Sequence, residues 1–242
     1  MIAVTFALPA ESKDLVSRLQ NKRRIPSQSG AARYGQIASR SLTIFHTGVG
    51  RRIAEERLTE FLDHQHQQFE VLISSGFAGG VSTELNVGEL FIGGNVSDPQ
   101  LLAIAKRALA HTRPHIGKLL TSSGIIHSAE ERMKVARERG ADAIDMETDV
   151  IEQTCVERGI PMLSLRVISD TVREPFPAPP AVLFDIEQQR TNIAGLAAYL
   201  MKRPGAIRRL MRFNRQIGRA RENLANALTS LVQDNSFGQI SC

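Results

Sequence analysis

The chain has 242 residues, of which 42% are hydrophobic and 23% are charged. This composition is close to that of an average globular protein, and it excludes the disordered, collagen-like and coiled-coil classes. No apolar run reaches the roughly 18 residues of a membrane span, and the N-terminus lacks the pattern of a secretory signal, so we expect a cytoplasmic protein. The two cysteines, Cys155 and Cys242, are too few for a disulfide framework or a metal site.

The net charge of +5 is concentrated at the C-terminal end. Eight basic and two acidic residues follow residue 200, which gives this tail a charge of +6 and leaves residues 1–200 at −1. Apolar residues recur there at helical spacing beside a stripe of arginines, namely Arg208, Arg212, Arg215 and Arg219. We predict a basic amphipathic helix that packs its apolar face on the body. Peripheral contact with the inner membrane is the alternative, and nucleic acid is not expected because aromatic residues are few.

Short apolar runs alternate with longer amphipathic segments, as in a sheet flanked by helices. The predicted strands are Ile2–Leu8, Ser41–His46, Val71–Ser75, Glu89–Gly93, Lys118–Ser122, Ala143–Asp145 and Met162–Ile168. The predicted helices are Ala10–Gln20, Arg52–His64, Pro99–His111, Ala129–Arg139, Thr148–Arg158 and Thr191–Met201. The sequence therefore predicts an α/β domain over residues 1–203, followed by the basic helix and tail over residues 204–242.

Two glycine-rich segments, residues 47–50 and 75–80, follow predicted strands. We expect turns there, in which glycine lets the backbone approach a ligand and leaves amide groups free to face it. Neither segment fits the phosphate-binding loop or the full dinucleotide fingerprint, so no nucleotide cofactor is expected. Ligands of open α/β sheets bind at the carboxyl ends of strands, and both segments lie at such ends.

Three carboxylates follow predicted strands in the same way: Glu11, Glu147 and Asp170. If these strands all run in one direction, the three side chains lie at one edge of the sheet. Glu11 and Glu147 are equally explained as acids that stabilise a helix N-terminus. Asp170 has no such explanation, because the prolines that follow it argue against a helix.

The chain resembles a known superfamily in three motifs: Gly-Phe-Ala-Gly-Gly followed by Gly-Glu over residues 76–89, Asp-Met-Glu-Thr at 145–148, and Val-Ile-Ser-Asp at 167–170. They are similar to motifs of the nucleoside phosphorylases and nucleosidases, above all of the methylthioadenosine/S-adenosylhomocysteine nucleosidases and the hopanoid-associated phosphorylases. The resemblance covers residues 2–170. It implies a single-domain, three-layer fold with a twisted mixed central sheet, a homo-oligomer, and a purine nucleoside, such as a 5′-substituted adenosine, as the substrate.

The resemblance also implies a role for each site residue. Glu147 would bind the ribose hydroxyls, with Met146 packed on the sugar, and Asp170 would protonate or hydrogen-bond the purine N7. Glu11 would position the attacking water. The remaining substrate-binding positions would be Thr47, Gly48, Phe77, Ala78, Gly79, Ile125 and Ile126. Glycosidic cleavage passes through an oxocarbenium-like state, which needs an acid on the leaving group and negative charge near the sugar.

Hydrolysis is the expected reaction, without cofactor or metal, and phosphorolysis with phosphate as co-substrate is the alternative. A phosphate site usually contains arginine, and Arg51 and Arg52 follow the segment 47–50. We interpret them as exposed residues at a helix start. Phe77 stands where many relatives carry serine, so a hydroxyl contact is missing. A non-catalytic nucleoside-binding protein is the second alternative, against which the full set of three carboxylates argues.

Overall fold

The structure, a computed structural model, describes residues 1–25, 32–65, 69–126, 128–177, 184–185, 190–191, 203 and 205–237. In these residues ten strands form one sheet: β1 (Ile2–Phe6), β2 (Gln20–Ile25), β3 (Ala32–Ile37), β4 (Arg40–His46), β5 (Val71–Gly80), β6 (Leu90–Gly93), β7 (His115–Gly117), β8 (Leu119–Thr121), β9 (Ala143–Asp145) and β10 (Met162–Asp170). A separate pair consists of β11 (Phe184–Asp185) and β12 (Arg190–Thr191). The helices are α1 (Pro9–Arg18), α2 (Arg51–Asp63), α3 (Pro99–Ala108), the 3-10 turn η1 (Ala110–Thr112), α4 (Ala129–Arg139), α5 (Thr148–Glu157) and α8 (Ala206–Gln233).

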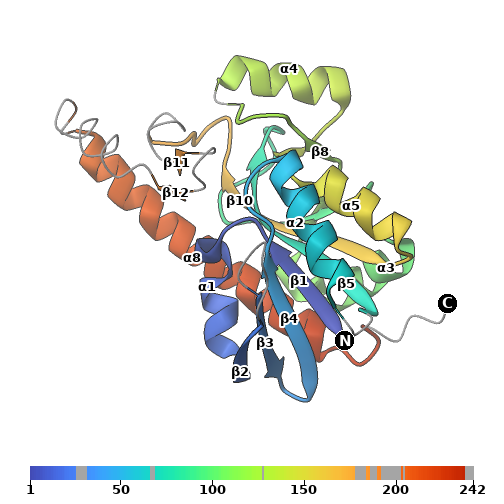
Figure 1. Cartoon of the computed structure of the whole chain (residues 1–242). Coiled ribbons are helices and arrows are strands. Elements are labelled where there is room, and N and C mark those ends of the chain that lie inside the picture. Colours follow the sequence, from blue (N-terminus) through green and yellow to red (C-terminus); the bar gives the residue numbers. More distant parts are fainter. Residues whose placement is uncertain are drawn as a thin grey trace.

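The sheet is covered by helices on both faces, which gives three layers (Figure 1). One face packs against α1, α3 and α8 in the larger core cluster, which includes Leu15, Leu101 and Leu228. The other face packs against α2 and α5, and its cluster includes Phe61 and Ile151. Central strands buried on both faces read as continuous apolar runs, and all of β10 is buried. The predicted α/β architecture with a mixed sheet is confirmed.

The strands at the centre of the sheet bring their carboxyl ends to one edge, because β4, β1, β5 and β10 are parallel neighbours. β9 does not share this direction: it pairs antiparallel with Gly79 and Gly80 of β5. The assumption that all strands before the three carboxylates run one way is therefore wrong for Glu147. β5 extends beyond the end of β1, whose pairing with β5 stops at Ser74, and β9 runs back along this extension, so Glu147 comes to the same edge from the opposite direction.

The glycine-rich segment 75–80 is not a turn, contrary to the prediction. It is the second half of β5, which pairs with β10 on one side and, at its end, with β9 on the other. The segment is therefore part of the sheet, although Gly76 has a φ of +141°. The segment 47–50 leaves regular structure as predicted.

Three strands of the sheet were not predicted, namely β2, β3 and β7. The sequence of β2 is polar and the strand is largely exposed at the sheet edge, so it carries no period-2 apolar pattern that would reveal it. The predicted helix Thr191–Met201 lies outside the described residues except for Thr191, which belongs to β12.

The C-terminal basic segment forms a helix of 28 residues, α8, as predicted. Its second half packs on the body, and the buried residues there are Ala220, Leu224, Ala225, Ala227, Leu228, Leu231 and Val232. Its first half extends past the sheet in Figure 1 and leaves Ile207 45% and Met211 59% exposed. The packing predicted for the whole helix thus applies to its second half.

Candidate active site

Glu11 lies in the first turn of α1, directly after β1, and is 8% exposed. Its Oε2 accepts a hydrogen bond from the Leu8 amide at 2.9 Å, and its Oε1 accepts one from the Phe77 amide at 3.1 Å. The first bond caps the helix, whereas the second ties the carboxylate to β5. Burial raises the pKa of Glu11, although both amides and the charge of Arg166 oppose this shift. Both the capping role and the site role therefore apply to this residue.

Gly76 allows β5 to pass close to this carboxylate. Its φ of +141° is unfavourable for residues with a side chain. A Cβ atom at this position would stand 3.1 Å from Glu11 Oε1. The glycine is thus required both by the backbone conformation and by the position of Glu11.

Glu147 precedes α5 and is 9% exposed, but it makes no side-chain cap of that helix. Its Oε1 accepts a hydrogen bond of 2.8 Å from the amide of Gly50, which comes from the segment after β4. Burial, followed by the negative charge of Asp145, raises the pKa of Glu147 to about 8. A carboxyl group in this state is close to half-protonated at mildly alkaline pH, and it can both accept and donate hydrogen bonds.

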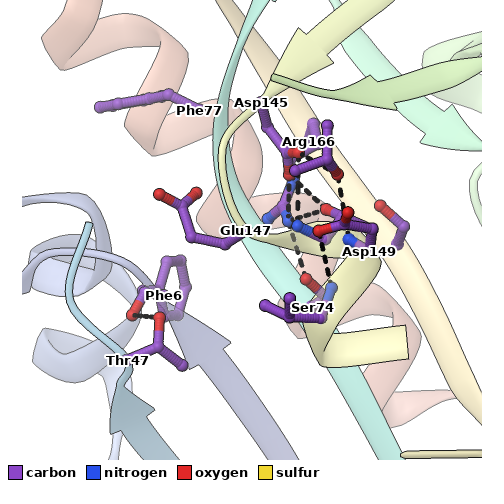
Figure 2. A network of polar contacts seen from close by, with 12 residues as sticks. Phe6, Thr47, Ser74, Phe77, Asp145, Glu147, Asp149 and Arg166 are labelled. Carbon is purple, nitrogen blue, oxygen red and sulfur yellow. Dashed lines mark hydrogen bonds and ion pairs between the residues drawn. The ribbon is translucent and has the colours of Figure 1, made fainter. Parts of the chain in front are cut away.

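Arg166 is a buried cation of the site that the sequence prediction missed. Its Nη2 donates to Ser74 Oγ at 2.7 Å, to Asp145 Oδ2 at 2.9 Å and to Thr148 Oγ1 at 2.6 Å (Figure 2). The available signal was the single charged residue of the predicted apolar strand Met162–Ile168, because a charge in a buried strand needs a buried partner.

A small cavity joins these groups. Its lining residues are Thr5, Phe6, Ala7, Glu11, Thr47, Ser75, Gly76, Phe77, Glu147, Ile151 and Arg166. In Figure 2 the Glu147 side chain points away from the Arg166 contacts, toward the side on which Phe6 and Thr47 lie. The free space in the cavity is about 10 Å³, close to the minimum that admits one water molecule.

Buried polar atoms without a hydrogen-bond partner gather at this cavity. Of the four such side-chain atoms in the described residues, three belong to its lining: Thr5 Oγ1, Ser75 Oγ and Arg166 Nε. Buried polar groups in native proteins are almost always bonded to protein or to ordered water. A small polar ligand in the cavity, such as water, is therefore a candidate partner for these atoms.

Asp170 lies outside the lining of this cavity. It ends β10, where a register shift between Ile168 and Asp170 pairs it with Gly79; such bulges re-aim side chains next to functional sites. Asp170 is 1% exposed and forms an ion pair with Arg132 of α4. The role of acid that the resemblance implied for Asp170 stays a prediction.

The other predicted positions are distributed around these two clusters. Thr47 and Phe77 line the cavity, whereas Gly48 and Met146 do not. Ala78 belongs to a core cluster, Gly79 faces Arg132, and Ile126 offers its carbonyl oxygen to Arg132. Ile125 is 38% exposed.

Arg51 and Arg52 form ion pairs with Asp149 and Glu56. Both are exposed, and neither lines the cavity, in agreement with their interpretation as exposed residues at a helix start.

Within the described residues, no group of three or more His, Cys, Asp or Glu side chains could hold a metal ion. The same residues contain no helix that is long and apolar enough to cross a membrane.

A larger, open groove lies at the opposite end of β1, around Met1, Lys22 and Arg40. Its charged lining residues are exposed or half-buried. Because it lacks buried, perturbed carboxylates, the groove is a weaker candidate than the small cavity.

The mixed sheet between two layers of helices, with buried carboxylates near the strand ends, defines a fold of the nucleoside phosphorylase and nucleosidase type. A sequence model of the phosphorylase superfamily matches residues 93–202. The chain is similar to the 5′-methylthioadenosine/S-adenosylhomocysteine nucleosidase of Chromohalobacter salexigens, with 25% identity over 202 residues that cover 70% of this chain and 83% of the relative. The same enzyme of Staphylococcus epidermidis is 22% identical over 198 residues, which cover 70% of this chain and 86% of the relative.

Solved structures agree on the fold. The 5′-methylthioadenosine/S-adenosylhomocysteine nucleosidase of Neisseria meningitidis, in complex with methylthio-immucillin-A, superposes with a TM-score of 0.71 at 18% identity, over 95% of this chain and 96% of that one. The native structure of futalosine hydrolase of Helicobacter pylori superposes with a TM-score of 0.70 at 16% identity, over 95% of this chain and 95% of that one. The resemblance inferred from the motifs is confirmed, and the relatives are enzymes, as predicted.

Proposed function

We propose that this protein is a nucleosidase, which hydrolyses the N-glycosidic bond of a purine nucleoside. The observation that carries the proposal is the cavity that joins Glu11, Glu147 and Arg166 with three unsatisfied buried polar atoms. The names of the relatives support a 5′-substituted adenosine as the substrate class.

The proposed roles follow from the contacts. Glu11, held by two amides, positions and activates a water in the cavity, with Arg166 Nε as a further donor to that water. Glu147 binds the ribose hydroxyls, to which a protonated carboxyl group can donate and an ionised one can only accept. In their ionised forms, the two carboxylates stabilise positive charge on the sugar in the transition state. Asp170 hydrogen-bonds the purine as it leaves.

The free space in the cavity is compatible with water as the nucleophile. Beside Glu11 it is about 10 Å³, which is close to the volume that one water molecule needs. Arg51 and Arg52, the two arginines that follow the segment 47–50, are paired with acids and lie outside the cavity lining. Hydrolysis therefore has the stronger support.

Product analysis tests this proposal. A panel of methylthioadenosine, adenosylhomocysteine, adenosine, inosine and an adenosine with a long 5′ alkyl chain is incubated with the protein, with and without phosphate. We expect free base and free sugar at equal rates in both conditions. Ribose 1-phosphate that forms only with phosphate would establish phosphorolysis instead, and binding without cleavage would identify a non-catalytic nucleoside-binding protein.

We also propose that the first half of α8 makes peripheral contact with an anionic membrane surface. Among the described residues, Arg208, Arg212, Arg215 and Arg219 have no ion-pair partner, and exposed Ile207 and Met211 lie beside them. Arginines next to exposed apolar side chains are typical of helices that lie on membranes.

The expectation of a homo-oligomer remains a proposal that light scattering of the purified protein would test.

A further inference from the structure

His46 is a buried histidine to which the proposed mechanism gives no role. It is the last residue of β4 and is 5% exposed. The strand before it carries Leu42, Ile44 and Phe45, which belong to the core clusters on the two faces of the sheet. Burying an imidazole in such surroundings costs free energy unless its nitrogen atoms are hydrogen-bonded. The contacts of His46 therefore indicate what this residue does in the protein.

Ser12 of α1 is a partner of the His46 ring. Its Oγ lies 2.8 Å from His46 Nε2, and both side chains are buried. The same hydroxyl donates to the carbonyl oxygen of Pro9 at 3.2 Å. Because the hydroxyl has one hydrogen and a carbonyl oxygen only accepts, the two contacts coexist when His46 Nε2 carries a hydrogen and donates to Ser12. Two hydrogen bonds in series then connect the end of β4 to the first turn of α1.

This connection joins the two segments that hold the carboxylates of the cavity. Ser12 directly follows Glu11 in the first turn of α1. His46 ends β4, and the segment that follows it includes Gly50, whose amide donates to Glu147 Oε1 at 2.8 Å. The contact between Ser12 and His46 thus links the turn that carries one carboxylate to the segment that binds the other.

Backbone hydrogen bonds link the same two parts of the chain closer to the sheet. The first two amides after β4 donate to the carbonyl oxygens of Phe6 and Ala7, at 2.9 and 3.0 Å. Glu11 lies four residues beyond Ala7, past the point where these bonds hold the chain. The side-chain contact between Ser12 and His46 extends the link from the strand end to the helix that carries Glu11.

The relative position of the two carboxylates matters for the proposed reaction, because Glu11 activates the water and Glu147 holds the sugar that the water attacks. A misplacement of about 1 Å can lower a rate by about 10²-fold. We propose that His46 is a positioning residue: through Ser12, it holds the turn that carries Glu11 against the segment that binds Glu147. This inference rests on the proposed nucleosidase function, in which both carboxylates act on one substrate.

The test compares two amides of different length at position 46. His46→Gln places an amide nitrogen near the position of the imidazole Nε2 and can still donate to Ser12, whereas His46→Asn is shorter by one methylene group and does not reach it. Ser12→Ala removes the hydroxyl, and Ser12→Ala/His46→Asn tests whether the two residues act together. The control is Ser17→Ala, because Ser17 is an exposed serine of the same helix that also donates to a carbonyl oxygen three residues earlier. Thermal unfolding first establishes that each variant is folded.

Steady-state kinetics with the best substrate of the nucleoside panel measures the effect. We expect His46→Asn and Ser12→Ala to lower kcat by about 10- to 100-fold, with KM within about twofold of the wild-type value. His46→Gln and Ser17→Ala keep most of the wild-type kcat. The double variant is no slower than the slower single variant, because the two residues act through one contact. A wild-type kcat in His46→Asn or Ser12→Ala, a His46→Gln protein as slow as His46→Asn, or losses that multiply in the double variant would overturn the proposal.

Amide hydrogen exchange separates this inference from the proposed function, since it needs no turnover. The amides of Leu8 and Phe77 both donate to Glu11, so their exchange rates, measured by NMR relative to the amides of β10, report whether this carboxylate stays in place. We expect faster exchange at both amides in the two disrupting single variants, and wild-type rates in His46→Gln and in the control. If no nucleoside is cleaved, the nucleosidase proposal fails, and the exchange rates alone decide whether His46 positions Glu11. Unchanged exchange in the disrupting variants would contradict it.

Discussion

The two polar clusters at the strand ends differ in how far their hydrogen bonds are satisfied within the chain. At the cavity, Glu11 and Glu147 are held by backbone amides, and three polar atoms lack partners. In the second cluster, at the end of β10, Asp170 is bonded to Arg132 and to Ser169.

The two clusters also differ in which segments of the chain supply their residues and hydrogen-bond partners. The cavity residues come from β1, β5 and β10 of the central sheet and from the segments that follow β1, β4 and β9, and a ligand would complete their hydrogen bonds. Asp170 instead obtains its partners from Arg132 of α4 and from the neighbouring Ser169. We therefore expect a ligand to change the hydrogen bonding of the cavity more than that of the Asp170 cluster.

Replacing Glu11 tests the cavity most directly. Glu11→Gln keeps the size of the side chain but removes the base that activates water, so we expect kcat to fall by about 10²- to 10⁴-fold with a small change in KM. Steady-state kinetics with the best substrate of the panel measures this. The control Glu55→Gln changes an exposed glutamate, and equal activity of Glu11→Gln and wild type would remove Glu11 from the mechanism.

Gly76→Ala sharpens the claim that β5 preorganises Glu11. The new Cβ would stand 3.1 Å from Glu11 Oε1, at a φ of +141°. We expect a loss of about 1–3 kcal/mol in the free energy of unfolding together with a lower kcat. Chemical denaturation and kinetics measure the two effects. Gly218→Ala, where a Cβ meets nothing within 4 Å, is the control, and a fully active, fully stable Gly76→Ala protein would contradict the argument.

The pH dependence of stability reports on Glu147. Its pKa is raised to about 8 from 4.5, first by burial and then by Asp145. Between these values the folded protein retains a proton that the unfolded chain releases, so stability is lost as the pH rises from about 4.5 to about 8. Urea denaturation from pH 5 to pH 9 measures the decline, which Glu147→Gln should flatten. Parallel curves for variant and wild type would show that another group causes it.

The smallest expected effect concerns α8 and leaves both clusters unchanged. Full-length protein with Arg208, Arg212, Arg215 and Arg219 replaced by Gln should lose sedimentation with anionic vesicles, because each basic residue near such a surface contributes about 1 kcal/mol. Neutral vesicles are the control, and catalytic activity in solution should not change. If neither protein sediments with anionic vesicles, the membrane contact is wrong.

The sequence predicted most of the elements that position the site. β1, α1, α5 and β10 have strong apolar patterns, and Glu11, Glu147 and Asp170 each follow a strand at or near the predicted position. Local periodicity is sufficient for β1 and β10, because strands that are buried on both faces form continuous apolar runs. The edge strand β2 could not be found in this way, since its exposed side chains follow no apolar period.

The pairing of side chains could not be predicted from the sequence. Arg132 reads as one more surface charge on a polar helix, and only its contact with Asp170 marks it as buried. Arg166 was visible as an unusual residue in an apolar strand, but its partners Ser74, Asp145 and Thr148 lie far from it in the sequence.

By itself, the sequence determined the layered α/β fold and the carboxylates at the strand ends, because apolar periodicity and the residues that follow a strand are local properties of the chain. Only the tertiary structure decided that Glu11 and Glu147 share a cavity while Asp170 pairs with Arg132 beside it. The separation of these two clusters depends on the reversed direction of β9, on the bulge in β10 and on the reach of the Arg132 side chain from α4. These features follow from packing between distant segments, which no local pattern encodes.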